Sequence, residues 1–186
     1  FHPEIIFHPI YVETMGDRDK ETSLRTLDKT DFFTRDIDQM LLRGECRIAV
    51  HSAKDLPDSL PKGIVIAAMT RGVDPSDSLV LKRYTLPEHG VVATSSVRRE
   101  ESVRGLFPHA RFVDIRGNIQ ERLARLETGE VDGIVIAEAA LIRLGLTHLC
   151  RLKLPGETAF HQGRLAVTVR TDDAEMLEVF SSIHHE

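Results

Sequence analysis

Cysteine is scarce in this sequence, and its scarcity excludes two kinds of protein. Cys46 and Cys150 are the two cysteines among 186 residues, too few for a disulfide framework. They also lack the paired spacing of a metal site, so we predict free thiols and no bound metal. The adjacent His184 and His185 do not change this expectation, because neighbouring residues on a helix point about 100° apart.

Long apolar runs are absent as well. No stretch approaches the ~18 apolar residues that a membrane-spanning helix needs, and the opening FHPEIIFHPI lacks the charged-then-apolar order of a signal peptide. We therefore expect a cytoplasmic protein with no membrane partner. Because the first residue is Phe1 and not methionine, we also expect the chain to begin inside a longer reading frame.

Positive charge is in overall deficit. The sequence has 24 Lys and Arg against 29 Asp and Glu, a formal net charge of -5. Nucleic-acid binding needs a basic face, so we expect no nucleic-acid partner. Residues 98–125 are an exception, since seven arginines outnumber four acidic residues there, which gives a local charge of 7 − 4 = +3. This segment is suited to an anionic ligand.

The apolar pattern alternates between strand and helix periods, which is typical of an α/β protein. A polar loop is expected near residues 16–19. Strand patterns cover residues 4–12, 47–50, 63–69, 91–94, 111–115, 133–137 and 165–170. Helical patterns cover residues 31–43, 96–107, 118–128, 138–144 and 172–185, the last with Met176, Leu177, Phe180 and Ile183 on its inner face. The alternation predicts mostly parallel sheets.

Two stretches with glycine and proline, residues 72–75 and 153–162, predict crossings between two lobes. We assign residues 1–75 and 159–186 to the first lobe, because the last strand and helix need a sheet to join. Residues 76–158 then form the second lobe.

The segment HSAKDLP at residues 51–57 follows a predicted strand directly, at the end where α/β sheets present ligands. Lys54 could neutralise an anionic group, while Asp55 could stabilise a cation or carry a proton. The alternative interpretation is a solvated turn that ends at Pro57.

Two predicted strand-to-helix junctions carry arginine. TSSVRR at residues 94–99 places Arg98 and Arg99 in a first helical turn, where free backbone N–H groups and the helix dipole favour carboxylate or phosphate. RGN at residues 116–118 repeats the design, with Arg122 one turn into its helix. In a parallel sheet the two junctions would converge on one crevice. We interpret Arg104 and Arg125 as solvated charges.

These segments, in this order, resemble the porphobilinogen deaminase family. The resemblance rests on HSAKDLP, TSSVRR, RGNIQERLARL at residues 116–126 and HQGRLAV at residues 161–167, and it covers nearly the whole chain. Four ordered motifs are far more specific than one. The resemblance implies two lobes of the periplasmic-binding-protein type with an active cleft between them, and a monomer.

The resemblance also implies a reaction. The family's enzymes are hydroxymethylbilane synthases of tetrapyrrole and heme biosynthesis, which condense four porphobilinogen units head to tail with loss of ammonia. Their dipyrromethane cofactor is linked by a thioether to a cysteine in a third domain. Asp55 matches the catalytic aspartate. The cofactor-binding positions match Lys54, Thr94, Ser95, Ser96, Arg98, Arg99, Arg116 and Gln162, and those that bind porphobilinogen and the growing polypyrrole match Arg116, Arg122 and Arg143.

The sequence departs from the family pattern in four places. The third domain with its attachment cysteine and the opening strand have no counterpart here, which predicts an incomplete or poorly active form. DKTDFF at residues 28–33 replaces a glycine-rich stretch, and His161 and Arg164 flank Gln162 where small residues are customary. The alternative is a non-enzymatic two-lobed binder of tetrapyrroles or other polycarboxylates. Asp55 beside Lys54 favours the enzyme, because an anion binder needs no acidic group facing its ligand.

Overall fold

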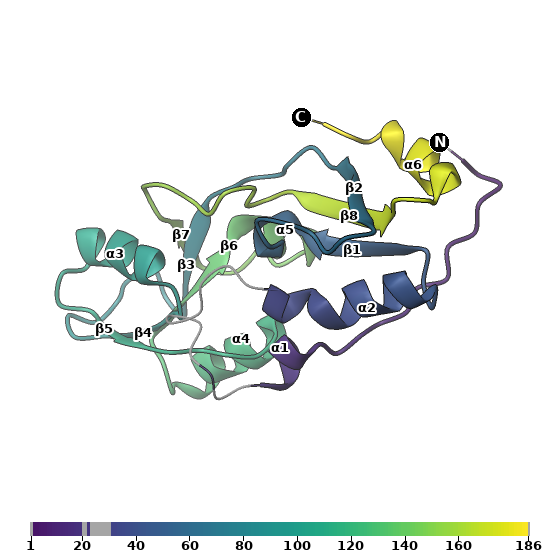
Figure 1. Ribbon diagram of the computed structural model, residues 1–186. Coiled ribbons are helices and arrows are strands. Elements are labelled where there is room, and N and C mark those ends of the chain that lie inside the picture. The colour runs from purple at the N-terminus through teal and green to yellow at the C-terminus, as the bar shows by residue number, and fades with distance from the viewer. Residues whose placement is uncertain (1, 20–21, 23–30, 186) are drawn as a thin grey trace. The chain divides into compact units, whose positions relative to one another are not determined.

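The computed structural model describes residues 2–19, 22 and 31–185 (Figure 1). Residues 28–30 of the DKTDFF stretch and Glu186 lie outside the described residues. The described chain forms two compact units, one of residues 2–19, 31–73 and 164–185, the other built on residues 74–163. The lobe boundaries inferred from the sequence remain a prediction. Within these ranges no helix combines the length and the hydropathy needed to cross a membrane.

The first unit contains a three-stranded sheet in the order β1-β8-β2. Its strands are β1 (Ile48–Ser52), β2 (Ile64–Met69) and β8 (Leu165–Arg170). β8 pairs antiparallel with both neighbours, so the prediction of mostly parallel sheets is wrong for these pairings. The reason is topological, because β8 is added between β1 and β2 when the chain returns from the second unit.

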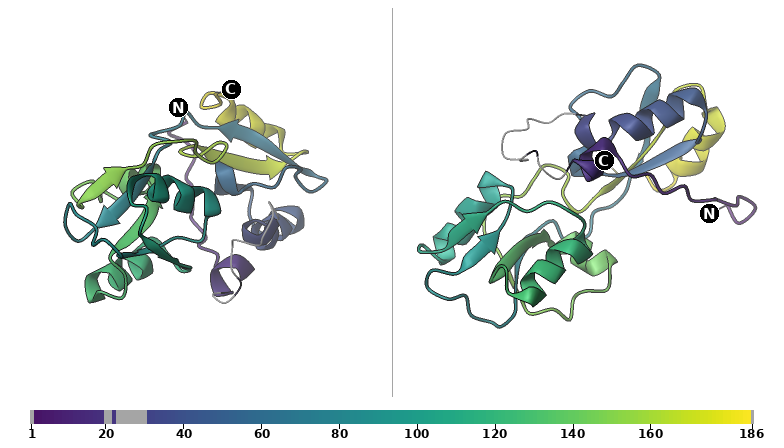
Figure 2. Two further views of the ribbon diagram at one scale, coloured as in Figure 1. Left: turned by 90° about the vertical axis from the view of Figure 1, so that its left-hand side faces the viewer. Right: turned by 90° about the horizontal axis from the view of Figure 1, so that it is seen from below.

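One helix covers each face of this sheet (Figures 1 and 2). On one face, α2 (Arg35–Arg43) packs Leu41 against Ala49 and Ile64. On the other face, α6 (Ala174–Ser181) packs Met176 against Val169. α2 follows a 3-10 turn at Asp31–Phe33 and ends at Gly44, whose φ of 71° is left-handed, as the predicted glycine stop requires.

Three sequence predictions in the first unit need correction. Residues 4–12 form no strand, and Ile6, Ile10 and Tyr11 are exposed; Pro9 also removes one of the N–H groups that a strand would use. The expected polar loop contains a short helix, α1 (Met15–Arg18), whose N-terminus is capped by a capping box between Thr14 and Asp17. The last helix ends at Ser181, which leaves Ile183 outside it and 41% exposed.

The second unit contains a five-stranded sheet in the order β5-β4-β6-β3-β7. Its strands are β3 (Asp77–Leu81), β4 (Val91–Ala93), β5 (Arg111–Val113), β6 (Gly133–Ala137) and β7 (Arg151–Lys153). β4 is parallel to β5 and β6, whereas β3 is antiparallel to β6 and β7. Four of these strands therefore run the same way, and the predicted mostly parallel sheet is confirmed here.

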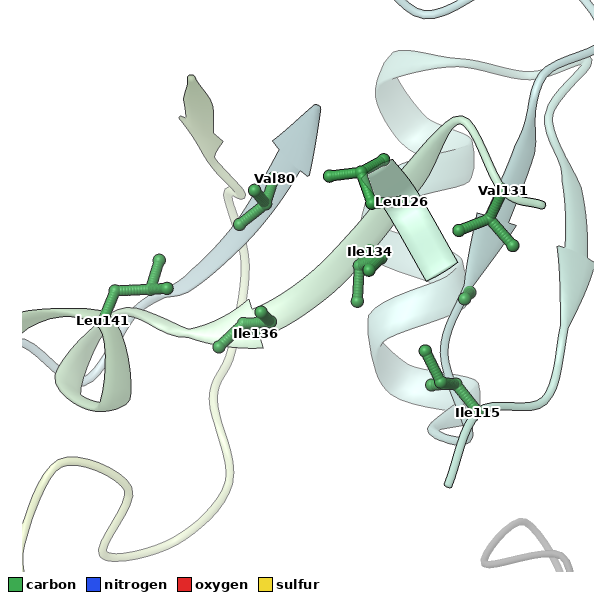
Figure 3. Close-up of a cluster of buried hydrophobic side chains, with 8 residues drawn as sticks. Val80, Ile115, Leu126, Val131, Ile134, Ile136 and Leu141 are labelled. Atoms are coloured by element: carbon green, nitrogen blue, oxygen red, sulfur yellow. The ribbon is translucent and has the colours of Figure 1, made fainter. Parts of the chain in front are cut away.

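Apolar side chains on alternate positions of the central strands build a core on each face of this sheet. On one face, Val80, Ile134 and Ile136 pack with Leu126 of α4 (Ile119–Thr128) and Leu141 of α5 (Glu138–Arg143) (Figure 3). On the other face, Leu79, Val92 and Val135 pack with Val103 of α3 (Val97–Leu106). Burial on both faces holds the strand ends that carry the site in place. The sequence analysis had missed β3 and β7.

Candidate functional site

The two arginine-bearing junctions lie side by side at the carboxyl ends of the parallel strands β4 and β5. Ser95, after β4, joins them: its hydroxyl donates to the carbonyl oxygen of Ile115 at 2.8 Å and accepts from the Ile115 N–H at 2.9 Å. The Thr94 N–H donates to the carbonyl oxygen of Val113 at 2.9 Å. Ser95 therefore fixes the second junction relative to the first.

The first junction begins α3. Ser96 is the N-cap residue, and its hydroxyl accepts from the Arg99 N–H at 3.5 Å. The buried Thr94 hydroxyl accepts from the Ser96 N–H at 3.3 Å. These two hydroxyl groups therefore shape the turn before the helix.

Arg98 and Arg99 converge on one buried carboxylate, that of Asp77 at the start of β3. Arg98 Nη2 lies 2.7 Å from Asp77 Oδ2, and Arg99 Nη2 and Nε lie 2.6 Å and 3.0 Å from Oδ1. Burial alone would raise the pKa of Asp77, but the charges and hydrogen bonds of Arg99 and Arg98 outweigh it and lower that pKa. Asp77 is therefore a carboxylate between two guanidinium groups.

Gln162 joins the same group of side chains. Its Nε2 donates to Asp77 Oδ1 at 2.9 Å and to the carbonyl oxygen of Pro75 at 2.6 Å, and the residue is 4% exposed. Arg98 Nη1 donates to the carbonyl oxygen of Glu157 at 2.6 Å. Side chains at the candidate site therefore hold both chain segments that lead out of the second unit. The exposed Arg143 donates from Nη2 to the carbonyl oxygen of Gly163 at 2.6 Å.

The second junction also has contacts that are local in sequence. Asn118 is the N-cap of α4, and it forms a capping box with Glu121 through bonds of 2.9 Å and 2.8 Å. Gly117 has a φ of 95°, where a side chain would also meet Glu121. Arg122 Nε donates to the carbonyl oxygen of Gly117 at 2.7 Å. Arg116, at the end of the preceding loop, is half-buried.

In the first unit, β1 leads directly into a 3-10 turn at Ala53–Asp55. Asp55 is exposed and Lys54 is half-buried. The Ala53 N–H donates to the carbonyl oxygen of Arg164 at 3.1 Å, which ties the turn to the residue before β8. Before the turn, His51 is buried and lies 3.3 Å from Thr168 Oγ1. Burial lowers the pKa of His51 to about 4, so His51 is neutral at pH 7.

The structure thus collects one part of the predicted site within the second unit. Hydrogen bonds join Thr94, Ser96 and Arg99, and Asp77 joins Arg99 to Arg98 and Gln162; Ser95 bonds to Ile115 of the neighbouring Arg116–Arg122 junction. Asp55 and Lys54 belong to the first unit, and their shared site with the arginines remains a prediction. Sequence reasoning missed Asp77 and the carbonyl group of Glu157. Among the described residues, no group of three His, Cys, Asp or Glu side chains is placed to hold a metal ion.

A family model described as "Porphobilinogen deaminase, dipyromethane cofactor binding domain" matches residues 2–178. This chain belongs to the porphobilinogen deaminase family. A porphobilinogen deaminase from Nostoc sp. is 39% identical over 193 residues, covering 98% of this chain and 60% of the relative. One from Synechococcus elongatus is 36% identical over 195 residues, covering 100% and 61%. The chain thus spans about three fifths of the length of these porphobilinogen deaminases.

A solved structure identifies the type of fold. A periplasmic substrate-binding protein of an ABC transporter from Coxiella burnetii superposes with a TM-score of 0.53 at 16% identity, covering 84% of this chain and 77% of the other. At that identity the likeness concerns the fold alone. It confirms the periplasmic-binding-protein type of α/β architecture expected for a porphobilinogen deaminase.

Proposed function

We propose that this chain functions as a hydroxymethylbilane synthase, an enzyme that condenses four porphobilinogen units head to tail with loss of ammonia. Family membership supports the reaction. The observation that carries the assignment to this chain is the arginine-lined edge of the second unit, where two junctions at parallel strand ends are bonded to each other. We extend the proposal to a cytoplasmic monomer that binds porphobilinogen and polypyrrole.

The side chains at this edge fit such ligands. Each pyrrole unit carries an acetate and a propionate group, and arginine is the side chain best suited to bind carboxylates in a planar fork. Arg98 is 31% exposed, and besides its bonds to Asp77 and Glu157 it has further N–H donors with no acceptor among the described residues. The donor chemistry therefore fits a dipyrromethane, which bears the same acidic groups.

The structure separates the proposed binding residues into two kinds. Arg98, Arg116, Arg122 and Lys54 are partly exposed and would contact the carboxylates of cofactor or substrate. Arg143, whose side chain is exposed, would contact those of the substrate. Ser95 and Gln162 instead bond to backbone or to Asp77 and would shape the site, as would Thr94, Ser96 and Arg99.

When bound, a dipyrromethane supplies the pyrrole chain end to which new units are added. Each addition would exchange the C–N bond of porphobilinogen for a C–C bond, with release of ammonia and one ring proton. The Asp55 carboxylate would stabilise the positive charge that develops on the pyrrole ring. Lys54, next in sequence, would neutralise a carboxylate of the same ligand. Arginines at the second unit would hold the remaining acidic groups.

The test separates chemistry from binding. We expect Asp55→Asn to lower the single-turnover rate of ammonia release from porphobilinogen by ~10²–10³-fold, because the amide cannot carry the stabilising charge. Binding of porphobilinogen should stay within a few-fold of wild type. Asp58→Asn, three residues further along the same loop, is the matched control and should leave the rate unchanged. Loss of affinity with an unchanged chemical rate would reassign Asp55 to binding. Binding without any turnover by the chain joined to the family's cofactor-bearing third domain would favour a non-enzymatic binder.

A further inference from the structure

The side chain of Asp77 accepts hydrogen bonds from three other side chains, although a strand position requires backbone hydrogen bonds alone. It is the first residue of β3, its side chain is 3% exposed, and its two oxygens accept from Arg98, Arg99 and Gln162 at 2.6 to 3.0 Å. The three donor residues come from distant parts of the chain, a helix start and the segment before β8. Asp77 is thus the common acceptor of three side chains matched to the cofactor site.

The charges around Asp77 do not cancel. Two guanidinium groups face one carboxylate, which leaves one positive charge in excess. Arg99 is 13% exposed and donates from both Nε and Nη2 to Asp77, so the charge of Arg99 is paired with that carboxylate. Arg98 is 31% exposed and keeps unused donors. The excess charge is therefore available at Arg98, near the positive end of the α3 dipole.

Two arginines in a first helical turn are unfavourable without a counter-charge, because they repel each other and the helix dipole. Asp77 supplies that counter-charge from below the helix start. A buried carboxylate also restricts orientation, since Arg99 bonds to it through Nε and Nη2 and Arg98 through Nη2. Without Asp77, the side chain of Arg98 would lose its main fixed contact, while the carbonyl of Glu157 would remain.

We propose that Asp77 is a positioning residue that, together with Arg99, holds Arg98 in the orientation needed to bind a ligand carboxylate. The proposal rests on the function proposed above, in which those carboxylates are the acetate and propionate groups of pyrroles. Asp77 does not touch the ligand in this arrangement. It acts through Arg98, which presents a pre-oriented set of donors and so loses less conformational freedom when a carboxylate binds.

The proposal predicts an affinity change opposite in sign to simple electrostatics. Asp77→Asn removes a negative charge beside two arginines, so charge alone would strengthen anion binding. If Asp77 positions the arginines, the same variant should weaken binding of porphobilinogen about tenfold, since the amide offers one acceptor in place of two. Asp77→Glu keeps the charge and both oxygens and should recover part of the affinity.

The matched control is Glu138→Gln in the same unit. Glu138 is 2% exposed and pairs with Arg151 at 2.8 Å, so its loss also breaks a buried ion pair, but one without contact to Arg98 or Arg99. Titration calorimetry should show its porphobilinogen affinity within about twofold of wild type. An equal loss in Glu138→Gln and Asp77→Asn would mean that both act through general stability, and it would overturn the proposal.

A measurement on the wild-type protein remains decisive if Asp77→Asn does not fold. Nuclear magnetic resonance of arginine Nε–H groups should show slow exchange and restricted rotation for Arg98 and Arg99, and faster exchange for the exposed Arg83. Freely rotating Arg98 and Arg99 side chains would refute the proposal. Resonances of Arg98 and Arg99 that stay restrained in a folded Asp77→Asn protein would refute it as well.

A second probe separates this proposal from the proposed function. Glutarate is a dicarboxylate without a pyrrole ring, and it is titrated into the same variants. Glutarate binding that depends on Asp77, without porphobilinogen binding, would support the positioning role and contradict the proposed function. Tight binding of both probes by Asp77→Asn would overturn the positioning role and leave the function standing. Failure of wild type to bind either probe would overturn both.

Discussion

The two arginine-bearing junctions look alike in sequence but differ in the contacts that their arginines make. At the first, Arg98 and Arg99 bond to the carboxylate of Asp77, which lies 21 and 22 residues earlier in the chain. At the second, Arg122 bonds to the carbonyl oxygen of Gly117, five residues earlier, beside the capping box of Asn118 and Glu121. The first junction therefore includes a buried carboxylate from a distant part of the chain, and the second includes a cap formed within its own turn.

This difference explains why the two junctions should respond differently to change. A contact between neighbours in sequence costs little chain entropy and survives small shifts of the sheet. A buried charge that meets a distant partner depends on the whole core beneath it, here Leu79 and Val103 around β3 and α3. Each prediction below changes one junction and uses the other for comparison.

The largest expected effect is the loss of Arg99. Arg99→Ala leaves Asp77 buried with one arginine fewer, and removing one partner of a buried pair typically costs ~3–5 kcal/mol. Arg122→Ala removes the bond from a half-buried side chain to the carbonyl oxygen of Gly117, and a hydrogen bond of this kind typically contributes about 1 kcal/mol. Urea unfolding followed by circular dichroism, with hydrogen exchange of peptides from β3 and α4 to localise the loss, measures both.

The double variant Arg99→Ala with Asp77→Ala sharpens the first result. Because the orphaned carboxylate is then removed too, its stability loss should be smaller than the sum of the two single losses by ~1–3 kcal/mol. Strict additivity would mean that the two residues do not interact in solution. Equal losses for Arg99→Ala and Arg122→Ala would erase the distinction between the junctions.

The next expected effect is a pH dependence confined to the first junction. The pKa of Asp77 is lowered in the folded protein, so its contribution to stability is present above its unfolded pKa of about 3.9. That contribution is lost as the pH falls below about 4 and the carboxylate is protonated. The effect should be smaller than that of Arg99→Ala, because the charges that lose their counter-charge on protonation are those of Arg98 and Arg99, which are partly exposed, whereas Arg99→Ala takes a partner from a carboxylate that is 3% exposed.

Hydrogen exchange between pH 5 and pH 3 tests this sign. Opening of α3 should increase as the pH falls, after correction for the intrinsic exchange rate, and the increase should be reduced in Asp77→Asn. His51 is a separate source of acid sensitivity in the first unit. Its pKa is lowered to about 4 by burial, so its contribution is present above about pH 6.5 and is lost as the pH falls toward 4. An α3 response that Asp77→Asn leaves unchanged would assign the titration to another group.

Local signals in the sequence predicted the fold well wherever a turn is built by its own residues. Gly44 ends α2 and Asn118 begins α4, as expected from glycine and asparagine at those positions. The capping box of Thr14 and Asp17 carried the same kind of signal for α1, although the pattern there was interpreted as a loop. These features depend on neighbours along the chain and are therefore visible in sequence.

Features that depend on distant partners were not visible. The apolar run of β3 could not be distinguished from a buried helix segment by periodicity, and its antiparallel pairing depends on β6 more than fifty residues away. Residues 4–12 have a strand-like pattern but no strand, because an apolar pattern does not supply a pairing partner. The site followed the same division, since the arginines were found from motifs and Asp77 was found from the structure.

The smallest expected effect concerns the two N-caps. Here the loss of stability should be larger at the second junction than at the first. Asn118 accepts from the Glu121 N–H at 2.9 Å while Glu121 returns a bond of 2.8 Å, whereas Ser96 accepts from Arg99 at 3.5 Å, the long end of the range. Replacing a cap by alanine costs ~0.5–2 kcal/mol. We expect Asn118→Ala near the upper half of that range and Ser96→Ala near the lower limit. The reason is that α3 is also held by Arg98 and Arg99 on Asp77, and that the cap of α4 consists of two shorter bonds. Adding Asp77→Asn should then make Ser96→Ala more costly, because the cap becomes the remaining anchor, and should leave the cost of Asn118→Ala unchanged. Hydrogen exchange of the first turns of α3 and α4 in these four proteins decides the matter, and a Ser96→Ala cost that is indifferent to Asp77 would show that the cap and the buried carboxylate act independently.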